Sequence, residues 1–271
     1  MGRNAFLNGT TATENIAIGY NALSTHATGG YSVAVGSRSL TSNTGNYNTA
    51  VGWASSLSNT SGLYNVAVGA MASEKNQTGS NNTSLGFKAM QGTVSNSHSN
   101  NVSVGYQSLV SVTTGGSNVA VGSLAGDALT TGADNVAIGY TALSTANTAN
   151  SNTAIGVSAM QSIPAGQAVS SCVAIGRLAL NGGGSTTTGI DGTVAIGFQS
   201  LTALTTGSSN TAIGYQSLLA TTTSSNNVAV GSTTGLQITS GDENVLIGRN
   251  AGRNGNVANN TYIGFEAGQG V

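Results

Sequence analysis

One short phrase of sequence recurs along the whole chain, and each copy ends on a glycine. Asn15–Gly19 reads Asn-Ile-Ala-Ile-Gly, and close variants of it return at Asn65–Gly69, Asn135–Gly139 and Asn210–Gly214. Most intervals between these anchoring glycines are 16 or 17 residues, and three are longer, at 19, 20 and 21. A fixed period with small insertions is typical of stacked repeat proteins. The sequence therefore predicts a single repeat array over residues 1–271, with no separate domain.

The residues around each glycine predict a β-strand, when positions are numbered from the anchoring glycine as zero. Position −3 is always β-branched, position −1 is Val, Ile or Leu, and position −2 is Ala or Ser in thirteen of fifteen repeats. Alternation with a period of two, rich in β-branched residues, indicates a strand. A second short strand or extended leg and a Thr-Gly or Ser-Gly turn follow it. We predict an all-β parallel β-solenoid (β-roll) of about fifteen 17-residue coils.

Two small-residue columns decide which side of each coil faces inward. Positions −2 and +3 carry mostly Ala or Ser, which suit the interior of a flattened coil. Position −4 is Asn in twelve of fifteen repeats, and we expect these side chains to form a hydrogen-bonded ladder along the stack. The Val and Ile residues at −3 and −1 then point outward. The alternative is that they fill the lumen of a monomeric solenoid.

An outward stripe of this length would exceed the apolar area that a monomer normally leaves in water. Covering a Val or Ile side chain stabilises by about 1.5–3 kcal/mol, so the stripe favours association with partner chains. The predicted oligomer interface includes Val33, Val35, Val66, Val68, Val102, Val104, Val136, Ile138, Val194, Ile196, Val228 and Val230.

The phrase resembles known repeat families. Asn65–Gly69 and Asn210–Gly214, each followed by a small residue three places on, are similar to the head repeats of trimeric autotransporter adhesins. Gly-Tyr-Gln-Ser-Leu at Gly105–Leu109 and Gly214–Leu218, with Gly-Arg-Asn-Ala-Gly at Gly248–Gly252, also resembles repeats of bacteriophage tail fibres. The resemblance implies a left-handed β-roll and a homotrimer whose Val/Ile faces surround a common axis. The 17-residue period is longer than the usual adhesin coil.

Composition excludes several functional classes. Only 6% of residues are charged and the net charge is −1, so we expect no nucleic-acid partner. No apolar run approaches the roughly 18 residues of a membrane span, and Met1–Phe6 enters a repeat without a signal-peptide core. We therefore expect no membrane insertion, and either a route other than classical secretion or a longer parent polypeptide. The single Cys172 is expected to be a small buried side chain.

Catalytic chemistry is not predicted. An active site needs convergent titratable groups, yet His26 and His98 lie in separate turn regions where we expect them to be solvated. The adjacent acids Asp242 and Glu243 would face opposite sides of an extended leg. We expect no enzymatic activity, no metal and no cofactor.

Aromatic residues and loop insertions are the candidate contacts with a receptor. Position +1 holds eight of the aromatic residues, which either stack on sugars and partner proteins or pack over the glycine turns. The three longer intervals place insertions at Ser95–Asn100, Ile163–Gln167 and Gly182–Asp191, which predict loops. The eight aromatic residues are Tyr20, Trp53, Phe87, Tyr106, Tyr140, Phe198, Tyr215 and Phe265. The candidate receptor contacts are Tyr20, Trp53, Tyr106, Tyr140, His98 and Pro164.

These features together predict a structural segment of a virion tail fibre. Its trimeric rod would present or contribute to binding of a host-surface glycan or protein receptor, and would join adjoining fibre proteins. The alternatives are a bacterial surface adhesin head or a self-assembling extracellular filament subunit. The expected location is the virion, or otherwise the cell surface or extracellular space. An ice-binding solenoid is disfavoured because no regular Thr array follows the strands.

Overall fold

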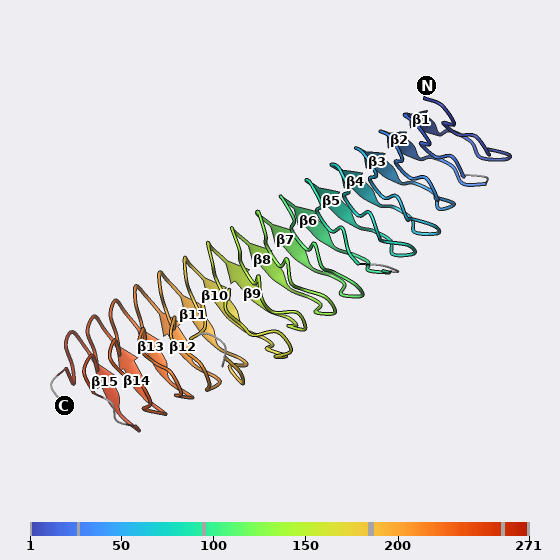
Figure 1. The fold of residues 1–271 in the computed structure, drawn as a ribbon. Helices are drawn as coiled ribbons and strands as arrows, with labels where there is room; N and C mark the ends of the chain where they lie inside the picture. Colours follow the sequence, from blue (N-terminus) through green and yellow to red (C-terminus); the bar gives the residue numbers. More distant parts are fainter. Residues whose placement is uncertain (1, 26–27, 94–95, 184–186, 256–257, 270–271) are drawn as a thin grey trace. The chain divides into compact units, whose positions relative to one another are not determined.

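The computed structural model describes residues 2–25, 28–93, 96–183, 187–255 and 258–269. The chain divides into two compact units, Met1–Ala133 and Asp134–Val271. Each unit is a parallel β-solenoid in which every coil contributes one short strand (Figure 1). The residues described contain no helix. The predicted all-β solenoid is confirmed for each unit.

All strands have three residues and occupy positions −3 to −1. The first unit contains β1 (Ile16–Ile18), β2 (Val33–Val35), β3 (Thr49–Val51), β4 (Val66–Val68), β5 (Thr83–Leu85), β6 (Val102–Val104) and β7 (Val119–Val121). The second unit contains β8 (Val136–Ile138), β9 (Thr153–Ile155), β10 (Val173–Ile175), β11 (Val194–Ile196), β12 (Thr211–Ile213), β13 (Val228–Val230), β14 (Val245–Ile247) and β15 (Thr261–Ile263).

Neighbouring strands pair in parallel with no slip between equivalent positions. Between β2 and β3, for example, Ala34 lies opposite Ala50 and Val35 opposite Val51. The register is unchanged across the longest intervals, where Val173 of β10 lies opposite both Thr153 and Val194. The inserted residues are therefore accommodated in the loops, as predicted. In each unit, equivalent residues form straight columns along the stack.

The interior of each unit is built from the small columns. The strand-centre residues Ala34, Ala50 and Ala67 have no exposed surface, and neither does the equivalent Ser84. Position +3 is also buried, and position +4 supplies the larger core side chains, such as Leu40 and Met90 in the first unit and Leu143 in the second. This arrangement confirms that positions −2 and +3 face inward.

Neighbouring side chains compensate where a core leucine is missing. Gly126 occupies position +4, where nine other coils carry Leu or Met. A Cβ atom built on Gly126 would lie 3.0 Å from Leu109 Cδ2 and 3.1 Å from Leu129 Cδ1. The side chains of the adjacent coil and of the following turn therefore fill the space that a leucine would occupy, which preserves dense packing.

The leg after each glycine is not a second strand, so that part of the sequence prediction is wrong. Positions +2 and +4 have left-handed backbone conformations, as at Asn21 (φ 54°) and Leu23 (φ 48°). The peptide groups alternate in direction as a result: Asn21 N donates to Arg3 O of the coil before, at 3.1 Å, and Leu23 N donates to Ser39 O of the coil after, also at 3.1 Å. The leg satisfies its hydrogen bonds coil to coil without an extended conformation.

The anchoring glycines touch one another from coil to coil. From Gly19 to Gly264 they have a φ between +127° and +140°, as at Gly36 (+137°) and Gly156 (+133°). A Cβ atom on Gly36 would lie 2.3 Å from the carbonyl oxygen of Gly52. Only glycine avoids both the conformational cost and the collision, which explains why this position never varies within the chain.

Replacement of Gly156 by alanine is expected to disrupt the stack. Its Cβ would lie 2.6 Å from the backbone of Gly176, so the left-handed strain of about 1–2 kcal/mol is joined by an overpacking cost, for a total of roughly 3–5 kcal/mol. Gly166 in the same unit has a φ of +84° and nothing within 4 Å of its Cβ position. Gly166→Ala should therefore lower the free energy of unfolding only by the cost of the left-handed strain. Urea unfolding of both variants checks the difference, and equal losses would contradict a contact role for the glycine column.

Buried asparagines form the predicted ladder. Asn65 Oδ1 accepts hydrogen bonds from the backbone N of Asn82 (3.1 Å) and from its Nδ2 (3.0 Å). Asn65 Nδ2 donates to Asn48 Oδ1 (3.2 Å) in the coil before and to the carbonyl of Gly79 (2.9 Å). Each amide thus connects neighbouring coils and also ties the strand to the facing turn. In the second unit, Cys172 takes this position, is fully buried as predicted, and still donates its backbone N to Asn152 Oδ1 at 3.0 Å.

Replacement of Asn65 by alanine should cost about 2–4 kcal/mol, because buried partners on both sides lose hydrogen bonds. Urea unfolding monitored by circular dichroism measures the loss. Asn8→Ala is the matched control, because Asn8 is exposed and its side chain forms no hydrogen bond with another of the described residues. It should change stability by less than about 0.5 kcal/mol. A similar loss in both variants would show that the ladder does not hold the coils together.

Candidate interaction surface

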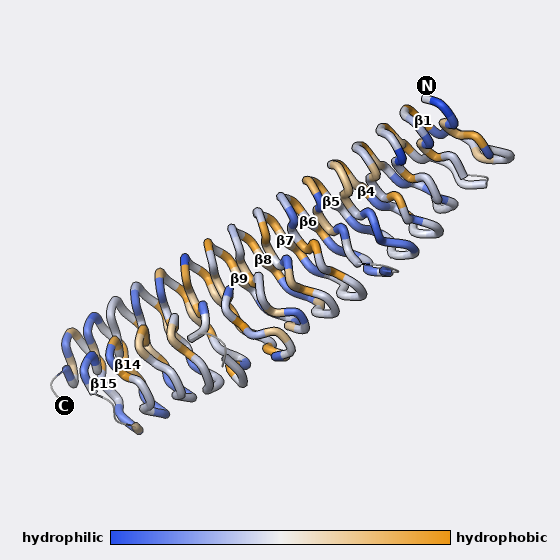
Figure 2. The backbone as a smooth tube through the Cα atoms, viewed as in Figure 1, coloured by the Kyte–Doolittle hydropathy of each residue, from blue (hydrophilic) through white to orange (hydrophobic). Residues whose placement is uncertain are grey.

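The strands expose a largely apolar ridge in each unit, formed by Val, Ile or Thr at position −3 and by Val, Ile or Leu at position −1. Ile16 and Ile18 are each 51% exposed, Val66 is 40% exposed and Leu85 is 48% exposed. Figure 2 shows hydrophobic segments recurring at the strands from coil to coil. Because the strand-centre residue points inward, its two neighbours must point outward. The alternative in which Val and Ile fill the lumen is therefore wrong.

Every residue predicted at the oligomer interface lies on this ridge and is exposed or half-buried in the single chain. This holds for Val33, Val35, Val66, Val68, Val102 and Val104 in the first unit and for Val136, Ile138, Val194, Ile196, Val228 and Val230 in the second. Their assignment to an interface between chains remains a prediction.

Aromatic residues at position +1 form a row beside the ridge. Tyr20, Trp53, Tyr106 and Tyr140 are about half exposed, at 46–54%. Where two aromatics occupy adjacent coils they stack, as for Phe87 and Tyr106, whose ring centroids lie 5.8 Å apart at 17°. The rings therefore cover one another in part and still present surface to a partner. Their role as receptor contacts stays a prediction.

A second aromatic row was missed by the sequence reasoning. Tyr31, Tyr47 and Tyr64 occupy position −5 in three successive coils, and each is about half exposed. The centroids of neighbouring rings lie 5.0 and 5.1 Å apart, with planes within 7°. The signal was present, because all three tyrosines stand five residues before an anchoring glycine. Positions −5, −3, −1 and +1 together form what we call the outer wall.

His98 is not the solvated loop residue that the sequence suggested, and it cannot be a receptor contact on the single chain's surface. It occupies position −7, an inward column where Val169 and Ile190 of the second unit are also buried. The equivalent residues of the coils before and after it are Gly79 and Gly115. His98 has no exposed surface, and neither ring nitrogen has a hydrogen-bond partner. Burial lowers its pKa to about 4.

Of the remaining residues predicted to lie in loops, the structure describes some and leaves others outside the described ranges. Pro164 is half-buried, and its carbonyl accepts a hydrogen bond from Gln167 N at 3.2 Å, while Ile163 beside it is fully buried. The insertion at Ile163–Gln167 is therefore partly anchored in the core. His26, together with Ser95 of the Ser95–Asn100 insertion and residues 184–186 of the Gly182–Asp191 insertion, lies outside the described residues.

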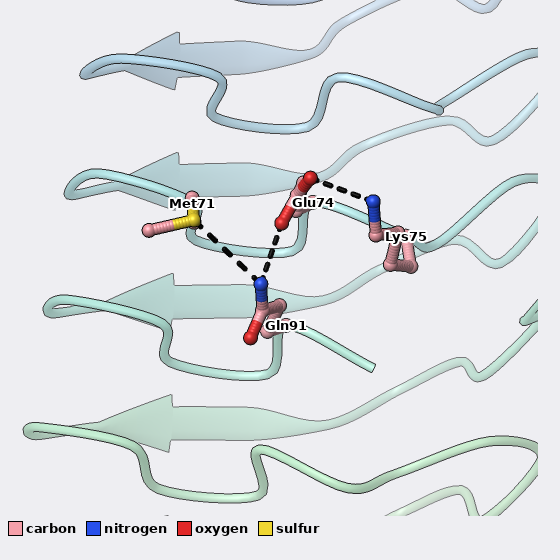
Figure 3. A network of polar contacts seen from close by, with 4 residues as sticks. All are labelled: Met71, Glu74, Lys75 and Gln91. Atoms are coloured by element: carbon pink, nitrogen blue, oxygen red, sulfur yellow. Dashed lines mark hydrogen bonds and ion pairs between the residues drawn. The ribbon is translucent and has the colours of Figure 1, made fainter. Parts of the chain in front are cut away.

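One polar network joins two coils of the first unit (Figure 3). Glu74 Oε1 pairs with Lys75 Nζ at 2.7 Å, and Glu74 Oε2 accepts a hydrogen bond from Gln91 Nε2 at 2.5 Å. Gln91 Nε2 also lies 3.7 Å from Met71 Sδ. Both carboxylate oxygens of Glu74 are therefore occupied by neighbours. The other groups in the network are the ammonium of Lys75, the amide of Gln91 and the thioether of Met71. The arrangement ties the coils together and supplies no acid–base pair.

The side chains that could ligate a metal or act as a nucleophile do not cluster in the described part of the chain. The described residues hold no cluster of three or more His, Cys, Asp or Glu side chains that would suit a metal ion. Burial raises the pKa of the Cys172 thiol to about 11, so it is protonated at neutral pH. Among the same residues, no helix has the length and apolar character needed to span a membrane.

Comparison of the chain with known protein families, with curated proteins and with solved structures gives no match.

Acidification is expected to weaken the coil that contains His98. The unfolded chain takes up this proton near pH 6.5 and the folded chain only near pH 4, so falling pH favours unfolding. The contribution is absent above pH 6.5 and reaches about 3 kcal/mol by pH 4. His98→Ile, chosen because Ile190 is buried in the same column, should remove it. Urea unfolding of both chains at pH 7.5 and pH 4.5 tests this, and an identical loss of stability in the two chains would contradict it.

Proposed function

We propose that the chain is a structural segment of a virion tail fibre, which assembles as a homotrimer and presents, or contributes to, a surface that binds the host. The observation that carries the proposal is the apolar ridge at positions −3 and −1. Its side chains stand in register along each unit and remain partly exposed in the single chain.

The energetic argument concerns the area left in water. Complete burial of a Val or Ile side chain contributes about 1.5–3 kcal/mol, and roughly half of that remains available at residues such as Ile16. The ridge recurs at every strand, so its total comfortably exceeds the cost of associating three chains. A strip this regular favours a partner with the same repeat, and the simplest partner is another copy of the chain.

The choice of a fibre rests on the resemblance of the repeats together with the character of the surface. Gly-Tyr-Gln-Ser-Leu and Gly-Arg-Asn-Ala-Gly resemble tail-fibre repeats, and the half-exposed aromatic row at position +1 offers contacts for a glycan or a protein receptor. A solenoid of near-identical coils suits a mechanical spacer because each coil is supported by its neighbours.

Light scattering coupled to size-exclusion chromatography tests the proposal. The chain has a mass of 26.5 kDa, and we expect a particle of three times that mass. Val66→Asp and Val228→Asp each place a charge on the ridge, at residues that are 40% and 36% exposed. Three carboxylates would then meet around the axis, so each variant should shift the species towards monomer.

Leu7→Asp is the matched control. Leu7 is 62% exposed but lies on the leg after Gly2, away from the ridge, so this variant should remain trimeric. Retained circular dichroism in all three variants separates loss of assembly from loss of folding. A monomeric wild-type chain at micromolar concentration would refute the proposal.

A further inference from the structure

The outer wall has two different edges. Position −5 precedes the strand and position +1 follows it, so these two rows border the ridge on opposite sides. Both rows are exposed, as at Tyr31, Tyr47 and Tyr64 on one edge and Tyr20 and Trp53 on the other. Any neighbour that covers the ridge must also approach these edges.

Cyclic symmetry decides which edges meet. In a ring of three parallel copies, the same surface cannot face itself, so one edge of each chain meets the opposite edge of the next. Because the axis runs along the stack, equivalent coils lie at the same level. The −5 residue of a coil therefore approaches the +1 residue of the same coil in the neighbouring copy.

The coil of β14 carries opposite charges at these two positions. Glu243 stands at −5 and Arg249 at +1, and both are exposed. Arg249 is held on its row by the ring of Phe265, whose centroid lies 5.1 Å from the guanidinium carbon. Six residues separate Glu243 from Arg249, up to roughly 20 Å of extended chain. The one ion pair within the described part of the chain is Lys75–Glu74, so these two charges are not paired with each other.

We propose that Glu243 of one chain forms an ion pair with Arg249 of the neighbouring copy, three times around the axis, and that these pairs stabilise the closed, in-register trimer. The inference rests on the proposed homotrimer. A shift by one coil would place Glu243 opposite Ser232 or Phe265 of the neighbour, neither of which carries a charge. Among these arrangements, the in-register assembly is therefore the one that neutralises both groups.

Side-chain sizes on the two edges of the first unit agree with this packing. The coils of β2 and β4 carry a tyrosine at −5 and a small residue at +1, namely Tyr31 with Ser37 and Tyr64 with Ala70. The coil of β5 reverses the order, with Asn81 at −5 and Phe87 at +1. A bulky group on one edge thus meets a smaller group on the other edge at the same level. Only the β3 coil places two large rings opposite each other, Tyr47 and Trp53.

Charge reversal and charge exchange in the full chain test the pair. Glu243→Arg and Arg249→Glu each create three contacts between like charges, and each should speed subunit exchange between differently labelled trimers by roughly three- to tenfold at low salt. The double variant Glu243→Arg/Arg249→Glu restores opposite charges with the sides exchanged. Its exchange rate should return to within about twofold of wild type.

A mispaired exchange is the matched control. Glu243→Arg/Arg253→Glu has the same net charge as the paired double variant, but Arg253 lies on the leg after the wall. It should exchange as fast as Glu243→Arg alone. If the wild-type chain is monomeric, the proposed trimer fails and this pair fails with it. If the wild-type chain is trimeric but the paired double variant is no slower than the single variants, or the single variants exchange like wild type, the ion pair alone is overturned.

Discussion

The contact between one anchoring glycine and the next is the constraint on which the rest of the structure depends. The backbones approach so closely that a Cβ at Gly36 would lie 2.3 Å from the Gly52 carbonyl oxygen, and the φ of +137° excludes other residues on conformational grounds as well. Coils that touch at this point can stack only in register. The asparagine ladder then secures the same register from the inside, because Asn65 Oδ1 accepts from both the backbone and the side chain of Asn82.

Because the coils stack in register, residues that recur with the sequence period form continuous rows on the surface of each unit. Once equivalent residues are aligned, a preference at one position becomes a row along the unit: buried alanine at −2, β-branched residues at −3, aliphatic residues at −1, and aromatic residues at +1 and −5. The interior is narrow because strand-centre residues such as Ala34 are small, so the aliphatic side chains are left outside. The same geometry that packs a thin coil therefore also produces a ridge that a second chain can cover.

The sequence predicted the features that depend on the period and missed those that depend on local backbone direction. The strand, the inward alanines, the asparagine ladder and buried Cys172 all follow from alternation and recurrence. The second leg was misjudged because left-handed residues such as Leu23 (φ 48°) leave no mark in hydropathy. His98 was misjudged because position −7 often holds glycine, so hydropathy does not mark it as an inward column. The Tyr31, Tyr47 and Tyr64 row was detectable from spacing but lies outside the recurring phrase.

Near-identical coils create a difficulty for any assembly of this chain. A ridge of similar aliphatic residues fits its neighbour almost equally well after a shift of one coil, so burial alone does not specify one register. Discrimination must come from the rare residues that differ between coils. The chain has few charges, and a coil that carries opposite charges on its two edges can therefore contribute to the choice, because a shift by one coil in either direction leaves Glu243 and Arg249 opposite neutral residues. The low number of charged residues therefore helps to specify the register in which the chains assemble. A wall rich in charges would offer many partly satisfied registers, whereas a sparse one leaves the choice to few coils. The one-coil shift that places Glu243 opposite Ser232 brings Glu14 opposite Arg3 instead, and the opposite shift pairs no charges at all.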